Sequence, residues 1–383
     1  PEGEALPPPG SLVDNEYSWL DVTDLVFIDP VSTGFSRPAE GQDAKQFHGV
    51  EQDISSVGDF IRLYTTRYER WLSPKFLAGE SYGTTRAAGL SGYLQQRHGM
   101  YLNGIVLVSS VLNFQTIVFN DGNETPFWLF LPSYTATAWY HKKLAPDLQA
   151  DLEKTLAEVE KWASTDYLLA LVRGNTLTEA ERKAVAQRLA RYTGLSEQFV
   201  LDTDLRININ HFTKELLRDQ GLTVGRFDSR YTGRDRDNVE SRYERDPSYS
   251  AVQGAFTAGF NDYVRRELQY KNDKSYEILT GRVRPWDYGN AQNSYLNVAE
   301  TLREAISQNP SLQVLFASGR YDLATPYYAA DYTITQLGLP LTYQPNISHA
   351  YYDAGHMMYT READLAKLKT DVAAFITRAL QGR

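Results

Sequence analysis

Short apolar runs alternate with helical periodicity in the first part of the chain. Apolar runs at residues 24–28, 76–78 and 105–108 each predict a buried strand. Apolar positions recur at helical spacing over residues 50–70, and small and apolar residues at 84–96 predict a second helix. Strands that alternate with helices are typical of a parallel sheet with helical crossovers. The pattern therefore predicts an α/β fold.

The alternation stops near Pro132. Residues 144–222 are rich in Leu, Ala, Glu, Lys and Arg at helical spacing, which predicts a helical insertion. The charged, turn-rich stretch at 228–246 is expected to be a solvated loop rather than a binding site.

The α/β pattern returns late in the chain, with three predicted helices and two predicted strands. The helices are expected at 298–306, 328–337 and 362–379, and the strands at 313–317 and 341–343. We therefore expect a first core part (1–132), a mainly helical cap insertion (133–285) and a second core part (286–383).

Composition excludes several classes of function. The chain has 383 residues, of which 42% are hydrophobic, and this is the content of a globular protein. No apolar stretch is long enough to span a bilayer, and a net charge of −9 disfavours nucleic-acid binding. The absence of cysteine excludes disulfides, thiolate metal sites and a cysteine nucleophile. Neither a metal nor a cofactor is expected.

The sequence Gly79-Glu80-Ser81-Tyr82-Gly83 joins a predicted strand to a predicted helix. In this setting it is typical of a nucleophile elbow, in which a serine on a tight turn exposes its hydroxyl. We expect the flanking glycines to avoid a clash between the strand and the helix. The motif is short, so its weight depends on partner residues elsewhere in the chain.

A serine hydroxyl needs a base and a carboxylate that orients the base. In α/β hydrolases these partners follow the serine in the order acid, then histidine, each after a later strand. Asp322 follows the predicted strand at 313–317, and His356 precedes the last helix. One helix and one strand fit between them, so both residues are candidates for the triad.

Each partner has a rival. His349 lies in the same connection as His356, which is favoured because Gly355 frees the backbone at the turn before it. Asp331 falls inside a predicted helix, and Asp353 lies in the loop that would carry the histidine. Asp322, at the end of a strand, is therefore the favoured acid.

At this point the chain resembles a known family, the serine carboxypeptidases (peptidase family S10), and in particular a bacterial-type member. The resemblance spans the chain apart from the helical insertion. It rests on five ordered motifs: Asn15-Glu16-Tyr17-Ser18-Trp19, Phe27-Ile28-Asp29-Pro30-Val31-Ser32-Thr33-Gly34-Phe35-Ser36, Gly79-Glu80-Ser81-Tyr82-Gly83, Gly319-Arg320-Tyr321-Asp322 and Gly355-His356-Met357.

The resemblance implies an α/β-hydrolase fold with a mostly parallel sheet and a helical cap. It implies release of C-terminal residues from peptide substrates through an acyl-enzyme, with Ser81 as nucleophile, His356 as general base and acid, and Asp322 as its orienting group. The backbone N–H of Tyr82 would be one oxyanion donor. Esterase, acyltransferase and lyase chemistry on the same triad, or a catalytically impaired binding scaffold, remain alternatives. A periplasmic or secreted location is favoured by the resemblance alone.

The resemblance also assigns substrate-binding roles to Glu80 and Met357. In the family this glutamate helps to bind the terminal carboxylate of the substrate. Two bare carboxylates repel, so Glu80 would have to be protonated or hydrogen-bonded, and activity on peptides is expected to be best at acidic pH. The alternative is that Glu80 is only a hydrogen-bonded spacer in the elbow.

The front of the chain departs from the family. The Asn-Gly-Gly-Pro-Gly segment, which would supply the second oxyanion donor, is absent from the residues that precede the run at 24–28. Either the sequence is the C-terminal portion of a longer protein, which Pro1 as the first residue favours, or it is a short form with a damaged oxyanion hole. Loss of one donor costs about a hundred- to a thousandfold in turnover. A partner, such as an N-terminal fragment of the same protein, would then complete the sheet and the oxyanion hole.

A smaller departure is Ser32, which stands where the family usually has glycine. Its effect on the loop after Pro30 is left open by the sequence.

Overall fold

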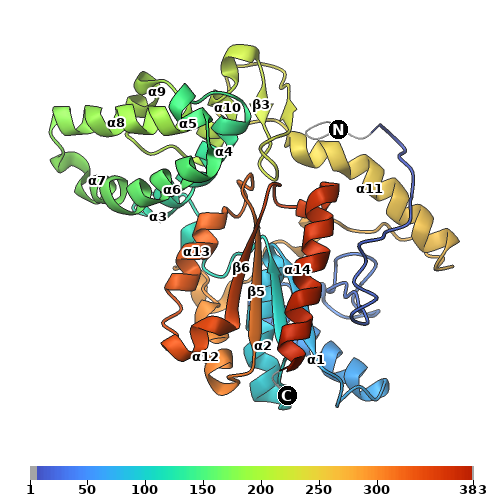
Figure 1. Ribbon diagram of the computed structural model, residues 1–383. Coiled ribbons are helices and arrows are strands. Elements are labelled where there is room, and N and C mark those ends of the chain that lie inside the picture. Colours follow the sequence, from blue (N-terminus) through green and yellow to red (C-terminus); the bar gives the residue numbers. More distant parts are fainter. Residues whose placement is uncertain (1–6, 382–383) are drawn as a thin grey trace.

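A four-stranded parallel sheet forms the centre of the structure, a computed structural model that describes residues 7–381 (Figure 1). The strand order is β1-β2-β5-β6, and each neighbouring pair is parallel. The strands are β1 (Phe76–Glu80), β2 (Gly104–Val108), β5 (Gln313–Gly319) and β6 (Ile347–Tyr352). In the described residues the antiparallel pairing of named strands is confined to a two-stranded ribbon of β3 (Thr223–Val224) and β4 (Thr232–Gly233). The predicted α/β class with a mostly parallel sheet is confirmed.

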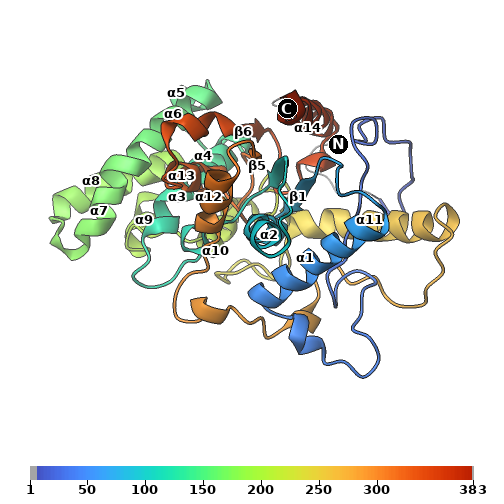
Figure 2. The ribbon, with the colours of Figure 1, turned by 90° about the horizontal axis from the view of Figure 1, so that it is seen from below.

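Helices cover both faces of the sheet, as the view from below shows (Figure 2). One face packs against four helices and the other against a single long helix. The four are α1 (Val50–Arg67), α2 (Tyr82–His98), α12 (Ala299–Gln308) and α13 (Tyr327–Thr335), and the single helix is α14 (Glu362–Gln381). Because β2 is buried on both faces, all five of its residues are buried, and its sequence reads as a continuous apolar run.

Helix α2 packs unusually close to its neighbours because small residues line its flanks. A Cβ atom at Gly89 would lie 2.3 Å from Cδ1 of Ile54 on α1, and one at Gly92 would lie 2.6 Å from Cγ2 of Thr301 on α12. The glycines therefore set the distance between helices and hold α2, which follows Ser81, firmly against the sheet.

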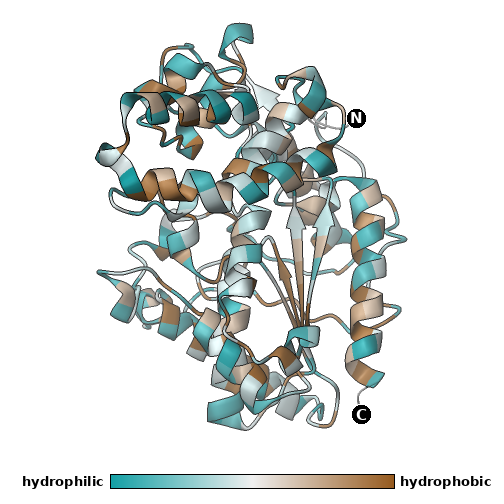
Figure 3. Ribbon diagram, turned by 60° about the vertical axis from the view of Figure 1, so that its left-hand side comes forward, coloured by the Kyte–Doolittle hydropathy of each residue, from teal (hydrophilic) through white to brown (hydrophobic). Residues whose placement is uncertain are grey.

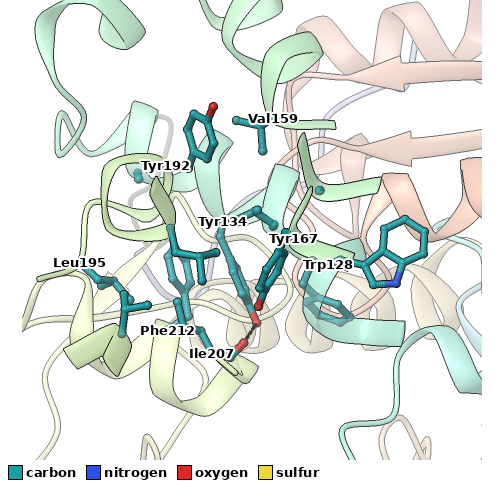
Figure 4. Packing of buried hydrophobic residues seen from close by; sticks show 14 of the residues in the cluster. Trp128, Tyr134, Val159, Tyr167, Tyr192, Leu195, Ile207 and Phe212 are labelled. Carbon is teal, nitrogen blue, oxygen red and sulfur yellow. Dashed lines mark hydrogen bonds between the residues drawn. The ribbon is translucent and has the colours of Figure 1, made fainter. Parts of the chain in front are cut away.

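A second, mainly helical body lies above the sheet. Its core contains large aromatic side chains, including Tyr134, whose ring stacks on that of Phe212 at 4.1 Å and whose hydroxyl donates to the carbonyl of Ile207 (Figure 4). Its helices are α3 (Thr125–Leu129), α4 (Leu131–Tyr140), α5 (Pro146–Gln149), α6 (Leu152–Trp162), α7 (Leu168–Arg173), α8 (Glu179–Thr193), α9 (Glu197–Asp202) and α10 (Ile209–Glu215). The predicted helical insertion over 144–222 thus contains helices α5 to α10.

Helix α11 (Pro247–Arg266) lies at the upper right of Figure 1, whereas the helical body lies at the upper left. Brown, apolar residues run along the central strands, whereas most helices carry teal residues on their outer faces (Figure 3). Among the helices that the structure describes, none is both long and apolar enough to cross a bilayer.

The strand predicted at residues 24–28 is wrong, because this segment has irregular backbone. Phe27 is 90% exposed, and only Ile28 packs against the core. An apolar run becomes a strand only when another strand accepts its hydrogen bonds. In the described sheet β1 is an edge strand that pairs with β2 alone, and residues 24–28 do not pair with it.

The short strand predicted at 341–343 is also wrong. Residues Leu341–Asn346 form a 3₁₀ helix, and the strand follows directly as β6. Pro340 precedes this turn and Pro345 lies within it, and proline lacks the N–H that a strand ladder requires. The apolar residues at 341–343 therefore mark the approach to a strand that begins a few residues later.

The solvated loop predicted at 228–246 is wrong at its start. Asp228, Ser229 and Arg230 are buried, and the guanidinium of Arg230 donates to both carboxylate oxygens of Asp228. Burial of a charged pair is tolerated because each charge neutralises the other. The later part, from residue 234 to 245, is largely exposed, as expected.

Packing around α2 gives a stability test. Leu94 on this helix is 0% exposed, whereas Leu72 is 98% exposed. We expect Leu94→Ala to lower the free energy of unfolding by about 2–5 kcal/mol, because it leaves a cavity, and Leu72→Ala to change it by less than about 0.5 kcal/mol. Urea titration followed by circular dichroism measures both variants, and equal losses would contradict the packing described for α2.

Candidate active site

Ser81 sits at the turn between β1 and α2. Its backbone has φ 55° and ψ −124°, a conformation that non-glycine residues rarely adopt. Such strain at a serine between a strand and a helix is characteristic of a nucleophile elbow. A Cβ atom at Gly79 would lie 2.1 Å from the carbonyl oxygen of Gly83, so only glycine fits at residue 79.

Gly83 plays a different part from the one expected. A Cβ atom there would meet nothing nearer than 4.0 Å, so its side is open. The close contact in the elbow comes from the Gly83 backbone, which approaches Gly79. The predicted clash is therefore avoided by the first glycine of the motif and not by the second.

The N-terminus of α2 supplies backbone donors beside Ser81. Tyr82 is the first residue of this helix, and the first N–H groups of a helix have no acceptor within it. A helix N-terminus also favours negative charge. The Tyr82 N–H is thus suitably placed to bind an oxyanion that develops next to the serine.

The parallel sheet brings the candidate residues to one edge. Ser81 follows β1, Asp322 follows β5 and His356 follows β6, and these strands all run in the same direction. The backbone N–H of Ser81 donates to the Val108 carbonyl at the end of β2, which fixes the elbow to the neighbouring strand. The carboxyl ends of parallel strands are the usual place for a site in an open α/β sheet.

Asp322 and His356 form a buried hydrogen-bonded pair. Nδ1 of His356 lies 2.8 Å from Oδ2 of Asp322, whose side chain is fully buried. The same carboxylate accepts from the backbone N–H groups of Ala324 and Thr325 and from the Thr325 hydroxyl. With its Nδ1 proton donated to Asp322, a neutral His356 has Nε2 free to accept a proton.

In the part of the chain that the structure describes, the Ser81 hydroxyl makes no hydrogen bond to His356. The hydrogen bond between a catalytic serine and its histidine is often long before substrate binds. Ser81 itself is partly exposed, in contrast to the buried His356.

The segment 227–230, most of which the sequence assigns to a solvated loop, clamps the histidine loop. The N–H of His356 donates to the Phe227 carbonyl at 2.6 Å, and the N–H of Gly355 donates to Asp228. The Arg230 guanidinium donates to the carbonyl of Asp353 at 2.7 Å. In the sequence only the Asp-x-Arg spacing hints at such a pair, because the contacts span more than a hundred residues.

The glycine before His356 is required by close packing. A Cβ atom at Gly355 would lie 2.4 Å from the Phe227 carbonyl oxygen, and its φ lies outside the left-handed region. Likewise, a Cβ atom at Gly319 would lie 2.2 Å from the carbonyl oxygen of Gly355. The two loops that carry Asp322 and His356 therefore touch backbone to backbone.

The pKa values of His356 and Glu80 are both shifted. Burial by itself lowers the pKa of His356, but the charge and hydrogen bond of Asp322, together with the charge of Glu80, raise its pKa above the ordinary imidazole value. Burial raises the pKa of Glu80, and this outweighs the opposite effects of His356 and of a hydrogen bond from Tyr359. Both groups thus favour the protonated form more than they would in water.

Glu80 ends β1 immediately before Ser81. The hydroxyl of Tyr359 donates to both of its oxygens, at 3.1 and 2.9 Å. Met357, the other residue with a predicted substrate-binding role, is partly exposed in the connection between His356 and Tyr359. Tyr359 itself is not singled out by the sequence, where a tyrosine among 26 gives no local signal.

The rival histidine belongs to a separate hydrogen-bonded chain. Nε2 of His349 lies 2.9 Å from the hydroxyl of Ser318, and its Nδ1 lies 2.8 Å from Asp331, which also accepts from Tyr351. Ser318 is part of strand β5 and is 1% exposed. This second Ser-His-Asp arrangement therefore presents no hydroxyl to a substrate.

The rival carboxylates do not join His356. Asp331 lies in α13, and Asp353 is exposed, with its side chain 3.7 Å from Arg320. In the part of the chain described by the structure, no group of three His, Cys, Asp or Glu side chains is placed to hold a metal ion.

Ser32 adopts the conformation that the family's glycine would allow. Its φ is 72°, in the left-handed region, and its hydroxyl lies 2.9 Å from Nε2 of the buried His48. The backbone strain of about 1–3 kcal/mol is partly offset by this buried hydrogen bond. The loop after Pro30 therefore keeps its turn.

A sequence model described as serine carboxypeptidase matches residues 7–374 of the chain. A search of curated proteins finds no match.

Two solved structures resemble the chain. One is Kex1ΔP, a prohormone-processing carboxypeptidase from Saccharomyces cerevisiae, with 16% identity, a TM-score of 0.53 and coverage of 94% of this chain and 75% of that one. The other is VinJ, with 14% identity, a TM-score of 0.32 and coverage of 87% and 74%. The likeness to Kex1ΔP is one of fold, and it confirms the predicted α/β-hydrolase fold.

The two serines of these Ser-His-Asp arrangements allow a labelling test. We expect a fluorophosphonate reagent to label the parent protein and the Ser318→Ala variant equally, and Ser81→Ala not at all, because Ser318 is buried and Ser81 is accessible. Mass spectrometry of the labelled peptides identifies the modified residue. Labelling of Ser318, or labelling that survives in Ser81→Ala, would refute the assignment.

Proposed function

Because the chain belongs to the serine carboxypeptidase family, we propose that it hydrolyses peptides from their C-terminal end through an acyl-enzyme on Ser81. The observation that carries the proposal is the buried bond between Asp322 and His356 at the same sheet edge as the strained Ser81. The fold shared with the carboxypeptidase Kex1ΔP is consistent with it.

In the first half of the proposed reaction, Nε2 of His356 takes the proton of the Ser81 hydroxyl as Oγ attacks the carbonyl carbon of the last peptide bond. The oxyanion of the tetrahedral intermediate accepts from the Tyr82 N–H. When the intermediate collapses, the C–N bond breaks and the His356 imidazolium donates its proton to the leaving amine. The C-terminal amino acid departs, and the remaining peptide stays esterified to Ser81.

In the second half, water attacks the ester and gives a proton to His356. Collapse of this intermediate breaks the bond to Oγ, and His356 returns the proton to Ser81. Asp322 keeps its own charge throughout and stabilises the imidazolium, which is the role favoured by its fully buried, fully hydrogen-bonded carboxylate.

Glu80 supplies the preference for a free C-terminus in this proposal. When protonated, its carboxyl group donates a hydrogen bond to the terminal carboxylate of the peptide. When ionised, it repels that carboxylate. Burial, which raises the pKa of Glu80, extends the protonated form to higher pH than in water. In this proposal Met357, which directly follows His356 and is partly exposed, contacts the substrate beside the leaving residue.

The pH profile of Glu80→Gln tests this role. In the parent, kcat/KM for a peptide should fall as pH rises through the pKa of Glu80 and also as pH falls through that of His356. In the variant the fall of kcat/KM at high pH should vanish, because the amide donates a hydrogen bond at every pH. At the alkaline end kcat/KM should then be about tenfold higher than in the parent. The acid limb should move to lower pH, because the variant lacks a charge that raises the pKa of His356.

An ester substrate without a free carboxylate is the control for Glu80→Gln. It should show the change in the acid limb but none in the alkaline limb. An unchanged peptide profile would refute the role of Glu80, and turnover of esters alone would favour the esterase alternative over the peptidase.

The edge of β1 supports a further part of the proposal, a covering strand. β1 pairs with β2 alone in the described sheet, and the apolar side chains of Val26 and Phe27 are exposed. An N-terminal fragment of the same protein that paired with this edge would complete the sheet and bring a second oxyanion donor.

Hydrogen exchange measures whether the edge is open. A strand paired on one side has about half of its amides without an acceptor. In a protein that consists of residues 1–383, we expect about half of the β1 amides to exchange much faster than those of β2, whose residues pair on both sides. Equal protection of all β1 and β2 amides, measured by NMR, would show that no strand is needed there.

A further inference from the structure

Tyr359 forms a forked hydrogen bond with the carboxyl group of Glu80, the residue before Ser81. The two residues lie far apart in the sequence. The phenol oxygen lies 3.1 Å from Oε1 and 2.9 Å from Oε2 of Glu80. At these distances the phenol O–H can donate to either oxygen of the carboxyl group.

The position of Tyr359 is fixed by its neighbours. It lies in the turn η9 (Met358–Thr360), where Met358 is fully buried and the Thr360 hydroxyl donates to the Met357 carbonyl at 2.8 Å. The same connection carries His356.

Protonation of Glu80 changes what Tyr359 can do. The phenol then donates to the carbonyl oxygen of the acid, and the acid O–H lies on the other oxygen. This arrangement leaves one donor on Glu80, with a defined direction, for a ligand carboxylate. The hydrogen bond with Tyr359 therefore occupies one oxygen of Glu80 and leaves the other for a ligand.

Tyr359 opposes the effect of burial on Glu80. Among the described residues, the titratable groups that act on Glu80 are Tyr359, His356 and Asp322. The phenol hydrogen bond and the charge of His356 favour the carboxylate, whereas burial and the charge of Asp322 favour the acid. Removal of the phenol O–H leaves the other three influences in place.

We propose that Tyr359 is a positioning residue of the terminal-carboxylate subsite, which orients Glu80 and sets the upper pH limit for binding of a free peptide C-terminus. This inference rests on the proposed function of Glu80 in binding the substrate carboxylate. The hydrogen bond from Tyr359 lowers the upper end of the pH range for binding, because without it Glu80 would hold its proton at higher pH.

The experiment is Tyr359→Phe in the full chain, with Tyr352→Phe as the matched control. The Tyr352 hydroxyl also donates to a carboxylate, that of Asp371 on α14, but this group does not contact Glu80. Two readouts are measured across pH: KM and kcat for a peptide with a free C-terminus and for an ester, and the titration of Glu80 by ¹³C NMR. Glu80→Gln assigns the Glu80 resonance.

In Tyr359→Phe we expect the midpoint of the Glu80 titration to rise by about one pH unit. The variant loses a hydrogen bond to the charged carboxylate, and one pH unit corresponds to about the energy of such a bond. The rise in peptide KM at alkaline pH should move by the same amount, with kcat at alkaline pH changed by less than about twofold. The ester profile should change only in its acid limb, through the charge of Glu80 on His356. Tyr352→Phe should move neither readout.

An unchanged or lower Glu80 midpoint in Tyr359→Phe would overturn the inference, as would an equal shift in the ester profile at alkaline pH or in Tyr352→Phe. A raised midpoint in a protein that turns over no peptide would support the link between Tyr359 and Glu80 and overturn the peptidase function. The two failures are therefore distinguishable.

Discussion

Parallel pairing of β5 with β6 is the constraint on which the site depends. Because the strands run in the same direction in fixed register, the loops after them emerge side by side, and Asp322 and His356 meet although a helix separates them in sequence. Backbone contact between Gly319 and Gly355 brings these loops closer than any larger residue would permit. The same direction of β1 places Ser81 at this edge, and the small residues of α2 let the helix behind Ser81 pack tightly between its neighbours. The chemistry of the site is thus set by sheet topology first and by side-chain type second.

Features that depend on local sequence could be predicted, and those that depend on distant partners could not. The elbow around Ser81, the strand before Asp322 and the helix after His356 each follow from a short run of residues, and their order along the chain limits how they combine. The run at 24–28 is as apolar as the true strands, but its state depends on a neighbouring strand that the sequence does not specify. The clamp formed by residues 227–230 and the contact of Tyr359 with Glu80, 279 positions earlier, arise only when the chain is folded.

Desolvation gives the site its particular electrostatics. Glu80 and His356 carry opposite charges when both are ionised, and each responds to the other across a poorly hydrated space. The buried carboxyl group of Asp322 accepts hydrogen bonds from backbone and hydroxyl donors. The buried chain of Ser318, His349 and Asp331 has the same His–Asp distance, 2.8 Å, but its serine has no access to solvent. The difference between the two serines lies in the backbone, which is a regular strand at Ser318 and a strained turn at Ser81.

The contact between Ser32 and His48 has an evolutionary consequence. A side chain at residue 32 must tolerate a left-handed backbone, and here the hydroxyl gains a buried partner that glycine could not use. Replacement of His48 alone would remove the partner and keep the strain, whereas return of residue 32 to glycine would leave the imidazole with an unsatisfied nitrogen. Each residue thus raises the cost of losing the other, so the two positions are expected to change together among relatives.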